Sequence, residues 1–159
     1  MTSPKIFRYG RIMTSRSYRV GRSVTGLGLF ATKPIKQGVY IAAYRGRRIT
    51  TEESDRREAR GARYMFALNK RWVIDGSPRW NLARYINHSC RPNAKPVGRR
   101  RGIVIVALRQ IEADEEITYD YGQEYLKAFL ADAGCRCAAC RKKKAPLRRR
   151  IKGAPKKLS

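Results

Sequence analysis

Arg84-Tyr85-Ile86-Asn87-His88-Ser89-Cys90-Arg91-Pro92-Asn93 is the most chemically dense stretch of this chain. It carries an asparagine, the only histidine of the chain and a cysteine before a turn-forming Pro-Asn pair. A structural interpretation makes it a strand end followed by a turn, in which Asn and Ser side chains cap local backbone groups. A purely structural segment rarely holds so many polar, chemically capable groups, so a functional site is the competing interpretation.

The composition limits the class of protein. The 159 residues are enough for one domain with a substantial core, and 37 Lys and Arg against 12 Asp and Glu give a net charge of +25. Such a charge favours acidic partners: nucleic acid, an acidic protein surface or anionic lipid. The sequence contains no apolar run of about 18 residues, and Met1–Tyr18 lacks the apolar core of a signal peptide. We therefore expect no membrane partner and an intracellular, reducing location, in the cytoplasm or nucleoid or in a nucleus.

Short β-type segments dominate the pattern. The expected strands are Val39–Tyr44, Tyr64–Leu68, Trp72–Ile74, Ile103–Leu108 and Glu115–Gly122. A charged helix is expected over Thr50–Arg60, with Thr50 or Thr51 as its N-cap. A second helix is expected over Glu124–Ala133, and we assign its apolar face, with Tyr125 and Phe129, to the core rather than to chemistry. The whole pattern predicts a mainly β domain.

Two glycines, Gly26 and Gly28, precede an apolar run and allow a backbone turn that a small molecule approaches closely. A bare GxG pattern is more often a plain hairpin turn, and the third glycine of a dinucleotide fingerprint is missing.

The four cysteines suggest a metal site. Cys135, Cys137 and Cys140 lie close together, and Cys90 is the only other cysteine in the chain. A structural zinc site takes four thiolate or imidazole ligands, so one four-cysteine site leaves no cysteine over. Two disulfides or free buried thiols are the alternatives, although a Cys135–Cys137 bridge would be strained and a reducing compartment disfavours oxidation.

Together these stretches resemble the SET-domain family of protein-lysine methyltransferases from about Ser17 to Cys140. Arg84–Asn93 resembles the family's central signature, and Glu116–Gly122 its second signature. Gly26–Ala31 resembles its opening GxG segment, Tyr44-Arg45-Gly46 its Tyr-x-Gly segment, and Cys135–Cys140 its post-SET zinc segment. The resemblance implies a mainly β fold of the β-clip type, with several small sheets, short helices, a threaded C-terminal segment and a post-SET zinc site.

Four parts of the chain are expected on this basis. They are a basic N-terminal segment (1–17), the SET domain (18–122), a linking helix with the post-SET zinc segment (123–140) and a basic disordered tail (141–159).

The resemblance also implies a function: transfer of a methyl group from S-adenosyl-L-methionine (SAM) to the ε-amine of a lysine in a protein, with histones or other nucleic-acid-associated proteins as candidate substrates. The implied catalytic residues are Tyr121, Tyr119, Tyr44 and Phe66. The implied SAM-binding residues are Thr25, Gly26, Leu27, Gly28, Tyr64, Arg84, Asn87, His88 and Tyr121, and the implied ligands of one structural zinc ion are Cys90, Cys135, Cys137 and Cys140.

The implied chemistry has physical requirements. The attacking amine must be neutral although the pKa of lysine is ordinarily about 10.4, and a narrow aromatic channel lowers that pKa by excluding water. The Tyr121 hydroxyl would align the amine, while Tyr119 would hold a water where a second methyl group would lie, so the expected product is mono- or dimethyl-lysine.

Three departures from the family pattern concern the substrate more than the chemistry. Arg47 stands where the family usually has Glu, Trp80 stands where it usually has Gly, and the cysteine-rich segment that often precedes the domain is not found. A non-catalytic nucleic-acid or chromatin-binding module is a competing interpretation, supported by the net charge and by ten Lys or Arg between Arg141 and Lys157. A zinc-stabilised interaction domain is another.

Half of the 12 acidic residues surround Tyr121 in sequence: Glu112, Asp114, Glu115, Glu116, Asp120 and Glu124. They predict an acidic rim near the lysine channel, or else acids that pair with neighbouring arginines. The basic tail is expected to bind nucleic acid, with a salt dependence that follows the number of phosphate contacts.

Overall fold

The computed structural model describes residues 17–99, 102–130 and 134–144. Most of the predicted basic N-terminal segment and most of the predicted basic tail therefore lie outside the described residues, as do Arg100 and Arg101 of a basic loop. Within the described residues, no helix is both long and apolar enough to cross a membrane.

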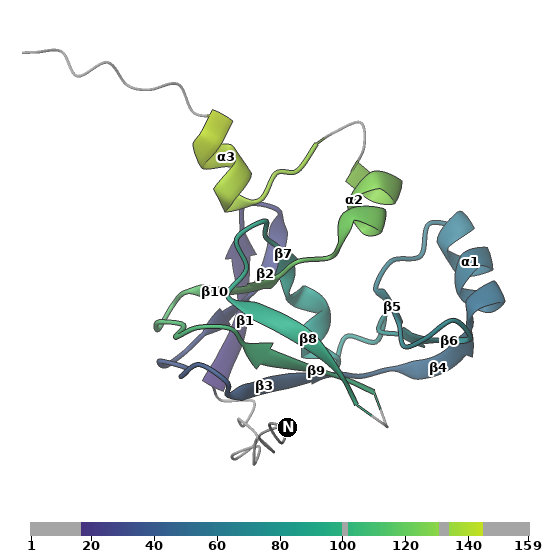
Figure 1. Cartoon of the computed structure of the whole chain (residues 1–159), viewed down its shortest axis with the longest axis horizontal. Helices are drawn as coiled ribbons and strands as arrows, with labels where there is room; N and C mark the ends of the chain where they lie inside the picture. The colour runs from purple at the N-terminus through teal and green to yellow at the C-terminus, as the bar shows by residue number, and fades with distance from the viewer. Residues whose placement is uncertain (1–16, 100–101, 131–133, 145–159) are drawn as a thin grey trace, which may run out of the picture.

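The first of three small sheets gathers strands from both ends of the domain (Figure 1). Its order is β1 (Tyr18–Ser23), β2 (Gly26–Ala31), β10 (Glu116–Tyr119) and β7 (Asn87–His88). β10 pairs with β2 antiparallel and with β7 parallel, in a register that sets Thr118 opposite Asn87 and Tyr119 opposite His88. The two stretches that carry the candidate chemistry are therefore hydrogen-bonded neighbours.

The second and third sheets each have three strands. The second has the order β3 (Tyr40–Tyr44), β9 (Gly102–Ala107) and β8 (Ala94–Arg99), and the third the order β4 (Arg47–Thr50), β6 (Trp72–Asp75) and β5 (Met65–Ala67). The continuous apolar run of β9 suits its central position, whereas β8, with Pro96, lies at an edge where a missing backbone N–H is tolerated.

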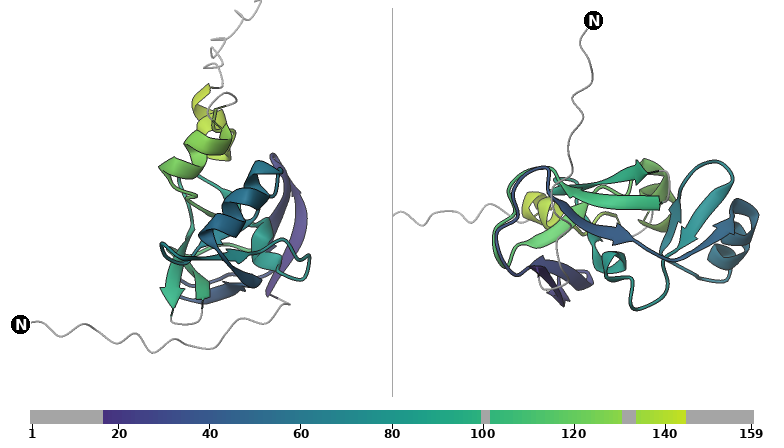
Figure 2. Two further views of the ribbon diagram at one scale, coloured as in Figure 1. Left: turned by 90° about the vertical axis from the view of Figure 1, so that its right-hand side faces the viewer. Right: turned by 90° about the horizontal axis from the view of Figure 1, so that it is seen from below.

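Short helices complete the fold. They are α1 (Thr51–Ala59), the 3₁₀ helix η2 (Leu82–Tyr85), α2 (Gln123–Leu130) and α3 (Ala138–Lys144). Thr50 caps α1 because its side-chain oxygen accepts a hydrogen bond from the Glu53 amide at 3.3 Å. The views in Figures 1 and 2 place α1 and α3 at opposite ends of the molecule, with the three sheets between them.

One hydrophobic core holds the sheets together. Its fully buried side chains include Leu29 of β2, Ile41 of β3, Ile105 of β9, Ile117 of β10 and Ile86 directly after η2. Burial of each such side chain stabilises the fold by about 1.5–3 kcal/mol. Tyr44 and Tyr119 belong to the same buried cluster, so the walls of the candidate channel are continuous with the core.

The mainly β fold predicted from the sequence is confirmed. Strands β1, β2, β4 and β8 were not among those predicted, because their sequences are basic or contain Gly or Pro. The predicted disorder is wrong for Arg141–Lys144, which belong to α3. The interpretation of the central stretch as a strand end and turn is right for β7, where Ser89 Oγ accepts a hydrogen bond from the Arg91 amide at 3.1 Å.

Candidate active site and cysteine cluster

A run of aromatic rings crosses from the second and third sheets to the first. The ring centroids of Tyr44 and Phe66 are 5.0 Å apart, those of Phe66 and Tyr119 are 6.1 Å apart, and those of Tyr119 and Tyr121 are 4.9 Å apart. These separations are typical of packed aromatic pairs. The structure therefore brings together the four residues that the sequence nominated for a lysine channel, from strands β3, β5 and β10 and the segment after β10.

The aromatic run continues along α2. The Tyr125 ring meets the Tyr121 ring edge-on at 4.8 Å, and Phe129 follows at 4.6 Å from Tyr125. The Arg63 guanidinium lies 4.8 Å from the centre of the Phe129 ring. The sequence assigned this helix face to the core, yet Tyr125 and Phe129 are only half-buried and extend the aromatic run. The signal that could have found them is the four-residue spacing of 121, 125 and 129.

The hydroxyl groups of the channel are fixed or buried. Tyr44 Oη donates a hydrogen bond to the Tyr64 carbonyl and Tyr121 Oη donates one to the Ile86 carbonyl, each at 2.7 Å. Burial raises the pKa of the Tyr44, Tyr119 and Tyr121 hydroxyls above the ordinary value of 10.0. All three are therefore protonated at neutral pH, and Tyr121 carries a hydroxyl group and not a tyrosinate.

Asn87 joins the GxG segment to the second signature. Its Nδ2 donates to the Leu27 carbonyl at 3.0 Å and to Glu116 Oε1 at 2.7 Å. Glu116 Oε2 accepts a hydrogen bond from Ser23 Oγ at 2.9 Å. A Cβ on Gly28 would overlap Glu116 Oε1, so only glycine leaves room for this carboxylate.

Glu116 contacts the candidate SAM-binding residue Asn87, and the sequence analysis did not include it in that set. The alternation of β10 could have indicated it, because Ile117 and Tyr119 are buried while Glu116 and Thr118 lie on the other face. Thr25 and Gly26 lie at the turn between β1 and β2, so the GxG segment forms a hairpin and also contacts Asn87 through Leu27.

Tyr64 and Arg84 form a second pair from the predicted SAM-binding set. The Arg84 guanidinium lies 3.8 Å from the centre of the Tyr64 ring, which is 39% exposed. Arg84 donates to the Ser77 carbonyl, but its Nε is buried without a hydrogen-bond partner among the described residues. Tyr64 has a φ of 70°, a left-handed conformation that is costly for a tyrosine and often marks a functional site.

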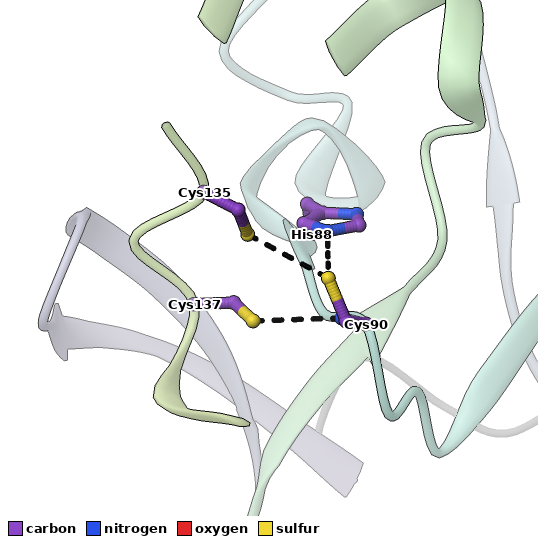
Figure 3. A group of neighbouring side chains, drawn as sticks. All are labelled: His88, Cys90, Cys135 and Cys137. Atoms are coloured by element: carbon purple, nitrogen blue, oxygen red, sulfur yellow. Dashed lines mark hydrogen bonds between the residues drawn. The ribbon is translucent and has the colours of Figure 1, made fainter. Parts of the chain in front are cut away.

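Cys90, Cys135 and Cys137 lie together beside His88 (Figure 3), and Cys140 joins them through a contact with Cys90. Cys90 Sγ lies 3.7 Å from Cys135 Sγ and 3.5 Å from Cys140 Sγ, and the Cys90 amide donates to Cys137 Sγ at 3.5 Å. A tetrahedral zinc ion with Zn–S distances of about 2.3 Å sets its sulfurs roughly 3.8 Å apart, whereas a disulfide needs about 2.05 Å. The spacing and the donors thus fit zinc and disagree with the disulfide alternative.

The electrostatics of the cluster favour a thiolate at Cys137. Burial opposes ionisation there, but hydrogen bonds from the Cys90 and Cys140 amides and from neighbouring thiols lower the pKa of Cys137 to about 6. Metal ligation requires the thiolate form of cysteine. His88 Nε2 lies 3.3 Å from Cys90 Sγ. The ligand atoms of His88, Cys90, Cys135 and Cys137 all lie within 4.8 Å of one another, and Cys140 Sγ is a fifth donor 3.5 Å from Cys90 Sγ.

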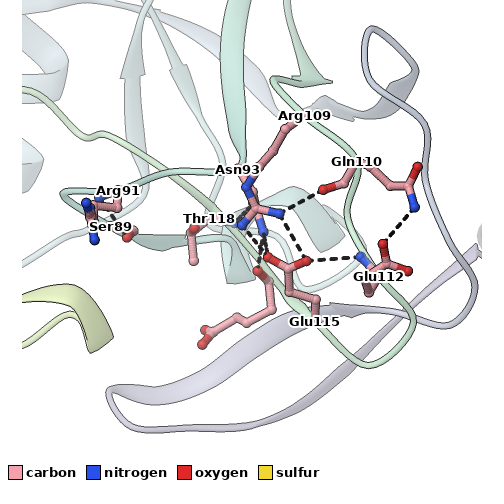
Figure 4. A network of polar contacts seen from close by, with 9 residues as sticks. Ser89, Arg91, Asn93, Arg109, Gln110, Glu112, Glu115 and Thr118 are labelled. Carbon is pink, nitrogen blue, oxygen red and sulfur yellow. Dashed lines mark hydrogen bonds and ion pairs between the residues drawn. The ribbon is translucent and has the colours of Figure 1, made fainter. Parts of the chain in front are cut away.

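The acids around Tyr121 separate into two groups. Glu115 binds Arg109 (Oε1 to Nη2, 2.6 Å) in the network of Figure 4, and Asp114 binds Arg19 at 2.9 Å. These two fit the pairing alternative and not a free acidic rim. Asp120 and Glu124 are exposed and have no Lys or Arg partner among the described residues.

Asn93, in the same network (Figure 4), holds β10 by three hydrogen bonds. Its Nδ2 donates to Glu115 Oε1 at 2.9 Å and to the Glu116 carbonyl at 2.8 Å, while its Oδ1 accepts from the Thr118 amide at 2.8 Å. Burial alone would raise the pKa of the Glu115 carboxyl, but hydrogen bonds from Arg109, the Glu112 amide and Asn93 outweigh it and lower the pKa to about 2.

The two residues that depart from the family pattern lie elsewhere. Trp80 is 64% exposed and borders hollows of about 440 and 280 Å³, and Arg47 is exposed on β4. Neither hollow is lined by Asn87 or Tyr121.

Comparisons with known proteins agree with this geometry. Residues 26–122 match the family model described as SET domain. The chain is 40% identical over 122 residues to an H3 lysine-4 specific histone-lysine N-methyltransferase of Saccharomyces cerevisiae, covering 70% of this chain and 11% of that protein. It is 42% identical over 107 residues to the histone-lysine N-methyltransferase trithorax of Drosophila virilis, covering 62% of this chain and 3% of that one. The chain thus spans about a tenth or less of the length of these relatives.

Solved structures show the same fold. A ctPRC2 structure in an autoinhibited conformation bound to S-adenosylmethionine is 31% identical with a TM-score of 0.62, covering 67% of this chain and 15% of that one. The Chaetomium thermophilum Polycomb Repressive Complex 2 bound to GSK126 is 33% identical with a TM-score of 0.61, covering 66% of this chain and 16% of that one.

Proposed function

This chain belongs to the SET-domain family, and from that membership we propose that it is a SAM-dependent protein-lysine N-methyltransferase. The observation that carries the proposal is the aromatic run from Tyr44 to Tyr121, which ends beside the hydrogen-bonded group of Asn87, Glu116 and Leu27. An aromatic channel for an alkyl-ammonium group next to a polar site for an amino-acid-like cofactor is the arrangement that lysine methylation needs.

SAM, when bound, supplies an electrophilic methyl group. The residues that would hold it are the predicted set, to which we add Glu116: Thr25, Gly26, Leu27, Gly28, Tyr64, Arg84, Asn87, His88, Glu116 and Tyr121. Asn87 is already oriented by Leu27 and Glu116, so it needs little reordering to bind a ligand.

The channel residues act on the substrate lysine. Tyr44 is 5% and Tyr119 8% exposed, so the walls they form with Phe66 exclude water and favour the neutral amine that attacks. Because the Tyr121 hydroxyl donates its proton to the Ile86 carbonyl, its oxygen is left to accept a hydrogen bond and align the amine. The proton lost on conversion of the ammonium to the amine goes to solvent at the channel mouth, since the buried tyrosines do not ionise.

Cys90, Cys135, Cys137 and Cys140 would hold one structural zinc ion, which ties the segment after α2 to the turn after β7. We also propose the division into a SET domain over 18–122 and a zinc segment over 123–140.

The substrate and partners follow from charge and from relatives. Several relatives are named as histone-lysine methyltransferases, which supports a lysine in a histone as substrate and a nuclear location. A basic protein with a net charge of +25 would bind nucleic acid, and residues 141–159 supply much of that charge.

Tyr121→Phe tests the function. We expect the variant to keep SAM binding within about threefold and to lose about 100-fold in turnover, because only the aligning hydroxyl is removed. Transfer of labelled methyl groups from SAM to histones and to a cell lysate measures turnover, and calorimetric titration measures SAM binding. Tyr125→Phe is the matched control, since its ring contacts Tyr121 while its hydroxyl has no hydrogen bond among the described residues. Wild-type protein that binds SAM without transferring methyl groups, or Tyr121→Phe with near-normal turnover, would contradict the proposal.

A further inference from the structure

We infer that His88 is a positioning residue whose two ring nitrogens join the cysteine cluster to the backbone of Tyr121. Nδ1 lies 3.2 Å from the Tyr121 amide nitrogen, and Nε2 lies 3.3 Å from Cys90 Sγ. The inference rests on the proposed function in one respect only. His88 affects catalysis only if Tyr121 takes part in methyl transfer.

The first step fixes the tautomer of the imidazole. The Tyr121 amide is a donor and its hydrogen points at His88 Nδ1, so Nδ1 must be the acceptor. A neutral imidazole that accepts at Nδ1 carries its hydrogen on Nε2. The 3.3 Å contact to Cys90 therefore runs from Nε2–H to the sulfur, with the sulfur as acceptor.

The second step concerns the sulfur. A metal-bound cysteine is a thiolate, and a hydrogen bond to an anionic acceptor is stronger than one to a neutral acceptor. The His88 side chain is 6% exposed, so the donor side of this bond is shielded from water, whereas Cys90 itself is exposed. Hydrogen bonds of this kind orient metal ligands and adjust their basicity. His88 would thus act on the cluster as an outer partner of Cys90 and not as a fifth ligand.

The third step concerns Tyr121. β10 ends at Tyr119, and the ladder to β7 ends with the pair Tyr119 and His88. The Tyr121 amide lies beyond that ladder, and His88 Nδ1 is its acceptor. The ring centroids of His88 and Tyr121 are 5.6 Å apart in an edge-on arrangement, so the same imidazole also packs against the phenol. A shift of Cys90 is therefore passed through one rigid ring to Tyr121.

Asp120 offers the competing arrangement. Its Oδ1 lies 3.5 Å from His88 Nδ1 and would favour a proton there, but that oxygen already accepts from the Gly122 amide at 2.9 Å. A proton on Nδ1 would also confront the hydrogen of the Tyr121 amide. The geometry favours the Nε2–H form.

Two substitutions test separately the hydrogen bond of His88 to Cys90 and its hydrogen bond to the Tyr121 amide. His88→Asn places a polar atom near the position of Nδ1 and retains an acceptor for the Tyr121 amide, while it removes the donor to Cys90. His88→Gln extends its amide toward the position of Nε2 and retains a donor to Cys90, while it removes the acceptor.

The experiment uses the full chain loaded with zinc or with cobalt(II). Long-range ¹⁵N–¹H correlation spectra of the wild-type zinc protein should show a neutral imidazole protonated at Nε2. His88→Asn should shift the sulfur-to-cobalt charge-transfer band and weaken metal affinity about 10-fold in a chelator competition, as loss of outer-shell partners does. His88→Gln should keep the band and keep metal affinity within about threefold, yet lower kcat about 10-fold.

Each result of these measurements either supports or overturns the inference. A wild-type imidazole protonated at Nδ1, or Nε2 bound directly to the metal, would overturn the inference even if a variant fails to fold. Variants that share one cobalt spectrum and one loss of kcat would also overturn it, because His88 would then be packing only. If the wild-type protein transfers no methyl groups, the proposed function fails, while the spectra still decide whether His88 joins Cys90 to Tyr121.

Discussion

Gly28→Ala should damage cofactor binding far more than it damages the fold. The new Cβ would overlap Glu116 Oε1 and would lie 3.0 Å from Ser23 Cβ and 3.1 Å from Glu116 Cδ. Most of this overlap is with the end of a flexible side chain, so the carboxylate can swing away without disturbing the β1–β2 backbone. The movement breaks the 2.7 Å hydrogen bond that orients Asn87.

The magnitude follows from that bond. A hydrogen bond to a charged group contributes about 1.5–3 kcal/mol. If the whole loss falls on the orientation of Asn87, SAM binding weakens by roughly 10- to 150-fold. The free energy of unfolding without SAM should fall by at most about 1–3 kcal/mol, the usual cost of an extra methyl group in a packed site.

Calorimetric titration with SAM and thermal unfolding without SAM measure the two quantities separately. Gly98→Ala is the matched control, because Gly98 also lies in a strand and a Cβ there would meet no atom within 4 Å. Gly28→Ala protein that binds SAM with wild-type affinity would refute the role given to Glu116 and Asn87. An equal loss in Gly98→Ala would show that any added methyl group in a strand has the same effect.

Three further predictions concern the metal, the product and acid stability. Wild-type protein should hold about one zinc per chain, and Cys90→Ser and Cys140→Ser should each lower this below about half an equivalent by elemental analysis, since all four thiolates share one ion. Tyr119→Phe should shift the product from mono- and dimethyl- toward trimethyl-lysine in mass spectra, because the Tyr119 hydroxyl has no hydrogen-bond partner among the described residues and is left to hold a water. The pKa of Glu115 lies near 2, below its ordinary value of 4.5, so its contribution to stability is complete above pH 4.5 and is lost toward pH 2. In Glu115→Gln, the free energy of unfolding from denaturant titrations should therefore fall less steeply between these pH values.

A specific result would contradict each of these three predictions. Zinc retained by Cys140→Ser would exclude that thiol as a ligand. Predominantly trimethyl-lysine from wild-type protein would remove the role of Tyr119. For Glu115, the control is Glu124→Gln, an exposed acid without a basic partner among the described residues, and an equal flattening there would contradict the assignment.

The sequence predicted the elements that depend only on residues close to one another along the chain. The apolar run of β9 and the cap of α1 by Thr50 needed no knowledge of distant residues. β8 was missed because Pro96 and Gly98 argue against a strand, and only its position at the edge of the β3–β9–β8 sheet makes them acceptable.

The same limit applies to the site. The count of cysteines predicted that Cys90 joins the three distant cysteines, because a zinc site needs four ligands wherever they lie in the sequence. Tyr125 was assigned to the core because helical spacing is the same for a core face and for the wall of a site, and its contact with the Tyr121 ring is visible only in the structure. The basic run after Cys140 predicted disorder, but Arg141–Lys144 continue the helix that begins at Ala138.

The position of β10 between β2 and β7 has a consequence for how the protein is made. A ribosome completes β2 and the Asn87–His88 strand long before Glu116–Tyr119 has been synthesised. Until then β2 has one open edge, the core lacks Ile117, and Cys90 has none of its three partner thiols. Contacts between residues so far apart in sequence form slowly, because closing the intervening chain costs entropy before any contact repays it. The candidate site therefore appears only when the chain has been made through Cys140, and a partly synthesised chain carries the signature residues without the complete candidate site.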